Sequence, residues 1–163
     1  MKILITGATG FIGTELMKYF ESRKHEIFGI SRTINKNKIK KMELNDRIKL
    51  DNYFKKNKFD IVIHLSSTLK DDNPIHIFQE NSIPLITLLE CCRLNKIKKF
   101  IFASSHMVYG NTDYVPIDEI HPKNPKKNYG IMKLINENIC KMYSTNYELD
   151  TIILRITSVY GKG

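Results

Sequence analysis

A tyrosine and a lysine stand four residues apart in the stretch NYGIMK, and together they could move a proton. Tyr129 and Lys133 would share one face of a helix, because residues at this spacing lie one above the other. A phenol normally titrates near ~10 and is a poor base at neutral pH. A lysine ammonium nearby stabilises the phenolate and lowers its pKa, so the pair predicts general acid–base chemistry at Tyr129.

A serine pair stands upstream of these residues, at the end of the apolar run FIFASS. Parallel sheets place their active sites at the carboxyl ends of strands, where Ser104 and Ser105 would lie. A hydroxyl there could hydrogen-bond a substrate oxygen as its charge changes. Taken alone, the serine is a strand-end cap and the Tyr/Lys pair a surface coincidence. Taken together, they predict a catalytic set of Ser105, Tyr129 and Lys133.

A glycine-rich turn, TGATGFIG, stands between a predicted strand and a predicted helix. Gly7 would permit the tight turn, Gly10 the approach of a pyrophosphate, and Gly13 close packing of helix on strand. The diphosphate would bind the free N–H groups at the helix N-terminus. A turn without a ligand is the alternative, but the position between strand and helix favours a dinucleotide.

The end of the second predicted strand bears on the choice between NAD and NADP. An acidic residue there would bond the ribose 2′-hydroxyl of NAD, whereas this chain has Ser31 and Arg32. A hydroxyl beside a guanidinium suits a phosphate monoester. The sequence therefore favours NADP over NAD, with an exposed surface arginine as the alternative reading.

Short apolar runs alternate with amphipathic segments along the chain. The runs at 2–6, 26–31, 60–67, 99–105 and 150–160 predict buried strands, and a weaker signal predicts a strand at 42–44. The segments at 11–23, 46–57, 75–95 and 128–147 predict helices. This alternation predicts an α/β fold with a doubly wound parallel sheet, the Rossmann fold.

Composition bounds the class of protein. With 163 residues, of which 42% are hydrophobic, the chain fits one globular domain spanning 1–163. No secretory signal or membrane-spanning run is expected, and three cysteines without metal-ligand spacing predict a reduced, cytoplasmic protein without a metal site. The net charge of +9 comes from dispersed lysine clusters without interleaved aromatic residues, so a nucleic-acid partner is not expected.

These motifs, in this order, resemble the N-terminal part of the extended short-chain dehydrogenase/reductases, the NAD(P)-dependent sugar epimerase/dehydratase family. The resemblance is carried by ITGATGFIG, DIVIHLSS, FIFASSHMVYG, YGIMK and LRITSVYGKG, and it runs nearly from end to end. It implies that a C-terminal domain, which would bind a nucleotide-sugar substrate, is absent from this chain. We therefore expect a truncated chain.

The resemblance also implies roles for individual residues. Tyr129 would be the acid/base, Lys133 its pKa partner and a ligand of the nicotinamide ribose, and Ser105 the hydroxyl that polarises the substrate. Asn81 would support the lysine, and Glu43 stands where an aspartate usually contacts the adenine amino group. With the glycine turn, the expected cofactor-binding residues are Gly7, Thr9, Gly10, Phe11, Ile12, Gly13, Ser31, Arg32, Glu43, Leu44, Leu65, Ser66, Asn81 and Lys133.

The implied function is hydride transfer in a nucleotide-sugar epimerase or reductase. His106 and Met107 stand where dehydratases of this family usually carry an acidic pair, which argues against a 4,6-dehydratase. The alternatives are a cofactor-binding fragment without turnover, a dehydratase, or a carbonyl reductase acting on a substrate other than a sugar. A homodimer is also implied, and Ile131, Leu134, Ile135 and Ile139 would face either its seam or the core.

Overall fold

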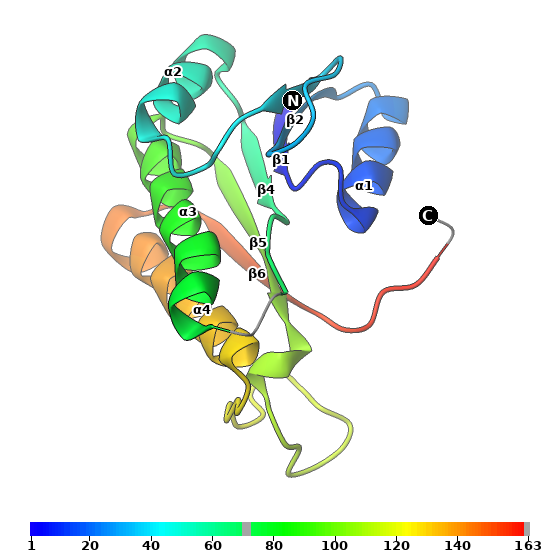
Figure 1. Cartoon of the computed structure of the whole chain (residues 1–163), viewed down its shortest axis with the longest axis vertical. Helices are drawn as coiled ribbons and strands as arrows, with labels where there is room; N and C mark the ends of the chain where they lie inside the picture. The colour runs from blue at the N-terminus through cyan, green and yellow to red at the C-terminus, as the bar shows by residue number, and fades with distance from the viewer. Residues whose placement is uncertain (70–72, 162–163) are drawn as a thin grey trace.

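A parallel sheet of six strands forms the middle of the computed structural model, which describes residues 1–69 and 73–161 (Figure 1). The strands are β1 (Lys2–Thr6), β2 (Glu26–Ser31), β3 (Ile39–Lys41), β4 (Ile61–His64), β5 (Lys99–Ser105) and β6 (Thr151–Ile156). Their order is β3-β2-β1-β4-β5-β6, and each neighbouring pair is parallel. The predicted doubly wound sheet is confirmed.

Helices cover both faces of the sheet. They are α1 (Phe11–Ser22), α2 (Arg47–Asn57), α3 (Pro74–Leu94) and α4 (Asn128–Tyr147), with a short 3₁₀ turn, η1, at His106–Val108. In Figure 1, α1 lies on one side of the sheet and the other three helices lie on the opposite side. Short polar residues fix two of the starts: the side chain of Asn73 accepts from the Ile75 amide, and that of Asp46 from the Lys49 amide.

The apolar residues of the strands alternate between these two faces. On β1, Leu4 packs with the core under α2, α3 and α4, whereas Ile3 and Ile5 pack on the side of α1. Each of the three is at most 1% exposed. Both faces of the strand are therefore buried, as expected in a parallel sheet.

The third strand lies earlier in the chain than the sequence predicts. It spans Ile39–Lys41, where Ile39 is the neighbour of Gly29 on β2, and the prediction of a strand at 42–44 is wrong. Met42 and Leu44 are buried, but their side chains belong to the core under α2 and α3. The apolar side chains of Met42 and Leu44 therefore indicate burial in the core and not pairing in the sheet.

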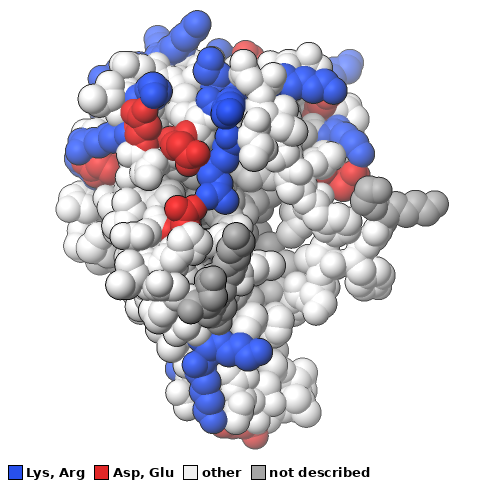
Figure 2. All heavy atoms as spheres, in the orientation of Figure 1, with Lys and Arg blue, Asp and Glu red and all other residues white. Residues whose placement is uncertain are grey.

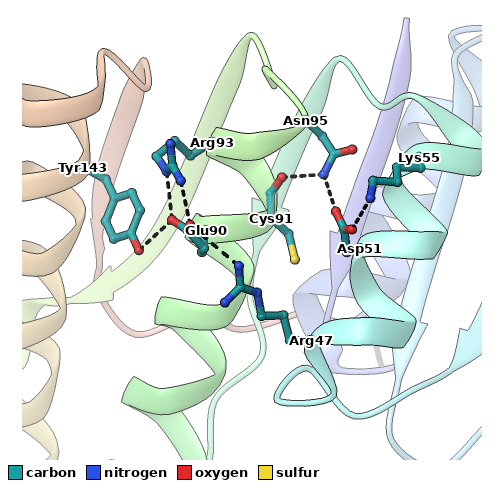
Figure 3. A network of polar contacts seen from close by, with 8 residues as sticks. All are labelled: Arg47, Asp51, Lys55, Glu90, Cys91, Arg93, Asn95 and Tyr143. Atoms are coloured by element: carbon teal, nitrogen blue, oxygen red, sulfur yellow. Dashed lines mark hydrogen bonds and ion pairs between the residues drawn. The ribbon is translucent and has the colours of Figure 1, made fainter.

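A polar network joins the three helices that share a face (Figure 3). Glu90 on α3 accepts a hydrogen bond from Tyr143 on α4 at 3.4 Å and lies 3.9 Å from the guanidinium of Arg47 on α2. Asn95, just after α3, donates to Asp51 on α2 at 2.9 Å. These contacts fix α2, α3 and α4 relative to one another on the outside of the core.

On the face shown in Figure 2, basic side chains lie in several groups, most of them on the upper half, and acidic side chains lie beside several of these groups. Within residues 1–69 and 73–161, no helix is long and apolar enough to cross a membrane.

An ion pair with a buried carboxylate connects α4 to the last strand. Glu137 is inaccessible to solvent and accepts from Arg155 on β6 through Nε at 2.9 Å and Nη2 at 2.8 Å. The hydroxyl of Ser104 on β5 donates to the same carboxylate at 2.7 Å. Burial raises the pKa of Glu137, but the hydrogen bonds from Arg155 and Ser104 outweigh burial and hold that pKa below its usual range.

We expect Glu137→Gln to lower the free energy of unfolding by about 3 kcal/mol, because it leaves the Arg155 guanidinium without its charged partner. The matched control is Glu148→Gln, at the exposed C-terminal end of the same helix. Since the pKa of Glu137 is depressed in the folded state, its contribution is present at neutral pH and is lost as the pH falls below the unfolded value. Urea unfolding at pH 7 and pH 4 measures both effects, and an equal loss in the two variants would contradict the prediction.

Candidate functional site

The glycine turn between β1 and α1 has no room for a side chain at Gly7 or at Gly13. Gly7 has a φ of +69°, and its amide donates to the Ile30 carbonyl oxygen at 3.1 Å. A Cβ built on Gly13 would lie 2.2 Å from the Gly7 carbonyl oxygen. The backbone of Gly10 begins α1, and no side chain caps that helix. The amides of its first turn are therefore oriented to bind an anion.

A cavity of about 250 Å³ lies between this turn and the carboxyl ends of β2 and β4. Among its walls are eight residues predicted to bind a cofactor: Gly7, Thr9, Gly10, Ser31, Arg32, Leu44, Leu65 and Ser66. The hydroxyls of Thr9 and Ser31, both in its wall, lie 3.1 Å apart, within hydrogen-bond distance. The sequence analysis missed Ile30, Thr33, Met42 and Ser67, which also line the cavity. The glycine turn, the uncapped helix and these hydroxyls fit the diphosphate and ribose of a dinucleotide.

Other predicted cofactor residues lie around this cavity. Phe11 and Ile12 form the first turn of α1, and Phe11 is exposed. Glu43 lines a smaller neighbouring cavity together with Leu44. The position of Glu43 follows from the short connection between β3 and α2, which carries the 43–45 segment past the carboxyl end of β2.

Asn81 is buried, and both the oxygen and the nitrogen of its side-chain amide are hydrogen-bonded. Its Oδ1 accepts from the Ser67 hydroxyl at 2.7 Å and from the Thr68 amide at 2.9 Å. Its Nδ2 donates to the Ile77 carbonyl oxygen at 2.7 Å. Asn81 thus ties the segment after β4 to α3, and the support that it was expected to give Lys133 stays a prediction.

Arg32 lies at the wall of the dinucleotide cavity with half of its side chain exposed. Its Nη1 donates to a carboxylate oxygen of Glu80 on α3. The contact of Glu80 with Arg32 could not be predicted from the sequence, because the end of β2 and the second turn of α3 meet only in the folded chain.

Lys133 is a buried charge at the junction of α4 and β5. Its Nζ donates to the carbonyl oxygen of Ala103 at 2.8 Å and lies 4.9 Å from the ring centroid of Phe102. The same nitrogen lies 5.5 Å from the ring centroid of Tyr129, so the expected pair does share one helix face. Burial lowers the pKa of Lys133 to about 8.

The two serines that end β5 have different partners. Ser104 donates to the buried carboxylate of Glu137. Ser105, two residues beyond the carbonyl that holds Lys133, accepts from the Met107 amide at 3.2 Å and so begins η1. Because that bond uses only the oxygen of Ser105, its hydroxyl proton can still be donated to a substrate.

The phenol of Tyr129 is partly buried near the segment that follows β4. Burial raises the pKa of Tyr129, and the nearby hydroxyl of Ser67 acts in the opposite direction. In this arrangement the Lys133 ammonium donates to the Ala103 carbonyl oxygen and does not bring that pKa below its usual value. The expected lowering of the Tyr129 pKa by Lys133 is therefore not seen here.

His64, at the end of β4, is buried beneath the site. The sequence analysis placed it only within a strand. The Nδ1 atom of His64 lies 2.7 Å from the Thr6 hydroxyl, and its ring stacks 6.0 Å from that of Phe102. Burial lowers the pKa of His64 to about 3, and the charge of Lys133 adds to this effect. The imidazole is therefore neutral at physiological pH. Among the described residues, no cluster of three or more His, Cys, Asp or Glu could hold a metal ion.

The fold and this edge of the sheet define a dinucleotide-binding protein of the Rossmann type. The model of the NAD dependent epimerase/dehydratase family matches residues 3–163, and the chain belongs to that family.

Curated relatives carry activities on nucleotide sugars. A dTDP-D-glucose 4,6-dehydratase of Dictyostelium discoideum is 32% identical over 191 residues, which cover 98% of this chain and 44% of the relative. A UDP-glucose 4-epimerase of Lacticaseibacillus casei is 28% identical over 175 residues, covering 99% of this chain and 52% of the relative. The chain thus spans about half the length of the curated relatives it matches.

Solved structures share the fold closely. A UDP-glucose 4-epimerase of Thermotoga maritima, solved with UDP-glucose, has a TM-score of 0.93 at 26% identity, with 99% of this chain and 57% of that chain covered. A UDP-glucose 4-epimerase of Brucella ovis in complex with NAD has a TM-score of 0.88 at 25% identity, with 94% and 51% covered.

Replacing Lys133 with methionine should raise the free energy of unfolding at pH 7 by about 2 kcal/mol, because it removes a buried ammonium. The pKa of Lys133 is about 8 in the folded chain, against an ordinary value of 10.5. Between these values the unfolded chain binds more protons, so wild-type stability rises with pH. The advantage of Lys133→Met should therefore be largest below pH 8 and should disappear towards pH 10.5.

Urea unfolding followed by circular dichroism across this range measures the difference. Lys141→Met is the matched control, since Lys141 lies exposed on the same helix and should show no such pH dependence. A difference between Lys133→Met and wild type that stays constant from pH 7 to pH 10.5 would refute the prediction.

Proposed function

We propose that this chain is the cofactor-binding and catalytic part of an NAD(P)-dependent nucleotide-sugar epimerase or reductase. The observation that carries the proposal is the position of the buried Lys133 ammonium, on one helix face with Tyr129 and bonded to the strand that ends in Ser105. This set lies at the same carboxyl edge of the sheet as the uncapped glycine turn. Family membership supports the same conclusion.

Each side chain has a role in this proposal. The phenol of Tyr129 takes the proton from a sugar hydroxyl and returns it, and the Ser105 hydroxyl donates a hydrogen bond to the same sugar oxygen. The Lys133 ammonium stabilises the phenolate and holds the nicotinamide ribose. The dinucleotide, when bound, supplies hydride acceptance and return. Because burial raises the pKa of Tyr129, its action as a base depends on the Lys133 ammonium, whose nitrogen lies 5.5 Å from the Tyr129 ring centroid.

A substrate-binding part would complete the enzyme. The relatives are about twice as long as this chain, and they are named for activities on nucleotide sugars. Ile152 and Leu154 on β6 are exposed, although they adjoin Ile101 and Ala103 in the sheet register. We infer that this apolar strip is covered by the substrate-binding domain in a complete protein.

An epimerase or reductase is preferred over a dehydratase. The first residue after the catalytic serine is His106, which is exposed, and the next is Met107; neither supplies a carboxylic acid to expel water. A cofactor-binding fragment without turnover is the alternative, and the tests below separate it from an enzyme.

A homodimer is part of the proposal. α3 and α4 pack on one another, and each keeps apolar side chains exposed: Ile83 and Ile86 on α3, Ile135 and Met142 on α4. Of the residues first considered for a seam, Ile139 packs against the core, whereas Ile135 is available for the seam.

Tyr129→Phe in a chain extended by its substrate-binding part should lower kcat about 10³-fold, because the proton shuttle is lost. Dinucleotide binding should stay within twofold, since the ring remains. Steady-state turnover of UDP-glucose, together with fluorescence titration of the reduced cofactor, measures the two quantities. Turnover within tenfold of wild type would exclude Tyr129 as the acid/base.

NADPH should bind more tightly than NADH, because the Arg32 guanidinium and the Ser31 hydroxyl can bond a 2′-phosphate. Arg32→Ala should bring the two dissociation constants to within about twofold, by loss of NADPH affinity. Fluorescence titration with both dinucleotides measures this. Equal affinities in the wild type would contradict a role for Arg32 in the choice between the two dinucleotides.

A further inference from the structure

An ion pair beside the dinucleotide cavity joins the end of β2 to α3. Arg32 donates to the carboxylate of Glu80, and both side chains are partly exposed, at 50% and 36%. Arg32 lines the dinucleotide cavity and also the smaller cavity next to it, whereas Glu80 lines only the smaller one. Arg32 is thus the partner that can contact a bound dinucleotide, and Glu80 accepts its hydrogen bond from the side of the smaller cavity.

The position of Glu80 is set by buried contacts of its neighbour. Asn81 follows directly and is bonded to Ser67, Thr68 and Ile77, so this turn of α3 is fixed to the segment after β4. Pro84, one turn further on, lines the same small cavity. The Arg32–Glu80 contact therefore starts from an anchored backbone, unlike an ion pair between two mobile surface side chains.

Carboxylates at this end of the cavity compete with a phosphate monoester for Arg32. Glu80 and Glu43 contribute two carboxylates to the small cavity, and Arg32 contributes one guanidinium. A 2′-phosphate, with about two negative charges, would need that guanidinium as its bidentate donor. It would have to share Arg32 with Glu80 or draw Arg32 away from it. A free ribose 2′-hydroxyl makes no such demand.

We propose that Glu80 is a specificity-determining residue, which limits the preference for NADP by holding Arg32 away from the 2′-phosphate. The inference rests on the proposed dinucleotide binding and adds the residue that sets its selectivity. NADH binding leaves the Arg32–Glu80 pair intact, so its affinity is independent of Glu80. NADPH binding must break the pair, so its affinity is reduced by the strength of that contact.

Glu80→Gln should therefore tighten NADPH binding about tenfold, as expected for removing one competing charge at contact distance, and leave NADH within about twofold. Fluorescence titration of the two reduced dinucleotides measures both constants. The matched control is Glu21→Gln, which removes a carboxylate paired with Lys38 at 2.8 Å at the C-terminal end of α1. That control should leave the NADPH/NADH ratio at the wild-type value.

The double variant Arg32→Ala/Glu80→Gln tests the route. If Glu80 acts by holding Arg32, the tenfold gain should fall to less than about twofold when Glu80→Gln is made in the Arg32→Ala background. An undiminished gain without Arg32, or an unchanged NADPH/NADH ratio in Glu80→Gln, would overturn this inference while dinucleotide binding stands. Failure of every protein to bind either dinucleotide would overturn the proposed function and this inference with it.

Discussion

The ammonium of Lys133 is buried and donates to the Ala103 carbonyl oxygen, so the carboxyl edge of the sheet has to accommodate a charge removed from water. A charge removed from water is stable only if other groups compensate for its lost hydration. Here a carbonyl dipole and the face of Phe102 do so, while His64 remains neutral beside them. The compensation is incomplete, as the lowered pKa of Lys133 shows. This is the pattern expected where stability is given up to place a charge for function.

Further buried polar side chains between α3 and α4 also need hydrogen-bond partners in fixed positions. The Ser82 hydroxyl donates to Asn136 at 2.7 Å, and both residues are buried. Glu137 follows Asn136 on α4, is paired with the Arg155 guanidinium and accepts a hydrogen bond from Ser104. Because each of these groups needs its partner in place, the two helices and β5 have one register in which all are satisfied. That register also sets where the first turn of α4 presents its tyrosine.

The order of strands and helices could be predicted from the sequence, since burial on both faces gives parallel strands continuous apolar runs. The bounds of β5 and α4 agree with the prediction residue for residue. Pairing could not be predicted with the same accuracy. The apolar positions at 42–44 were assigned to a strand because they are buried, but the hydrogen bonds to β2 are made by 39–41. Likewise β4 ends at His64, and the run continues as Leu65 to Ser67 along the cavity wall.

The site shows the same division between what is local in the sequence and what is not. The glycine turn and the Tyr129–Lys133 spacing are local, so their geometry follows from one loop or one helix. The partners that modify them come from distant elements: Ser67 near the Tyr129 phenol, and Glu80 on the Arg32 guanidinium. A motif therefore predicts which groups are present, whereas the protonation of Tyr129 and the availability of Arg32 are decided by residues that only the fold brings near. For this chain, the motifs predict the reacting groups, whereas the contacts of Ser67 and Glu80 could be identified only from the structure.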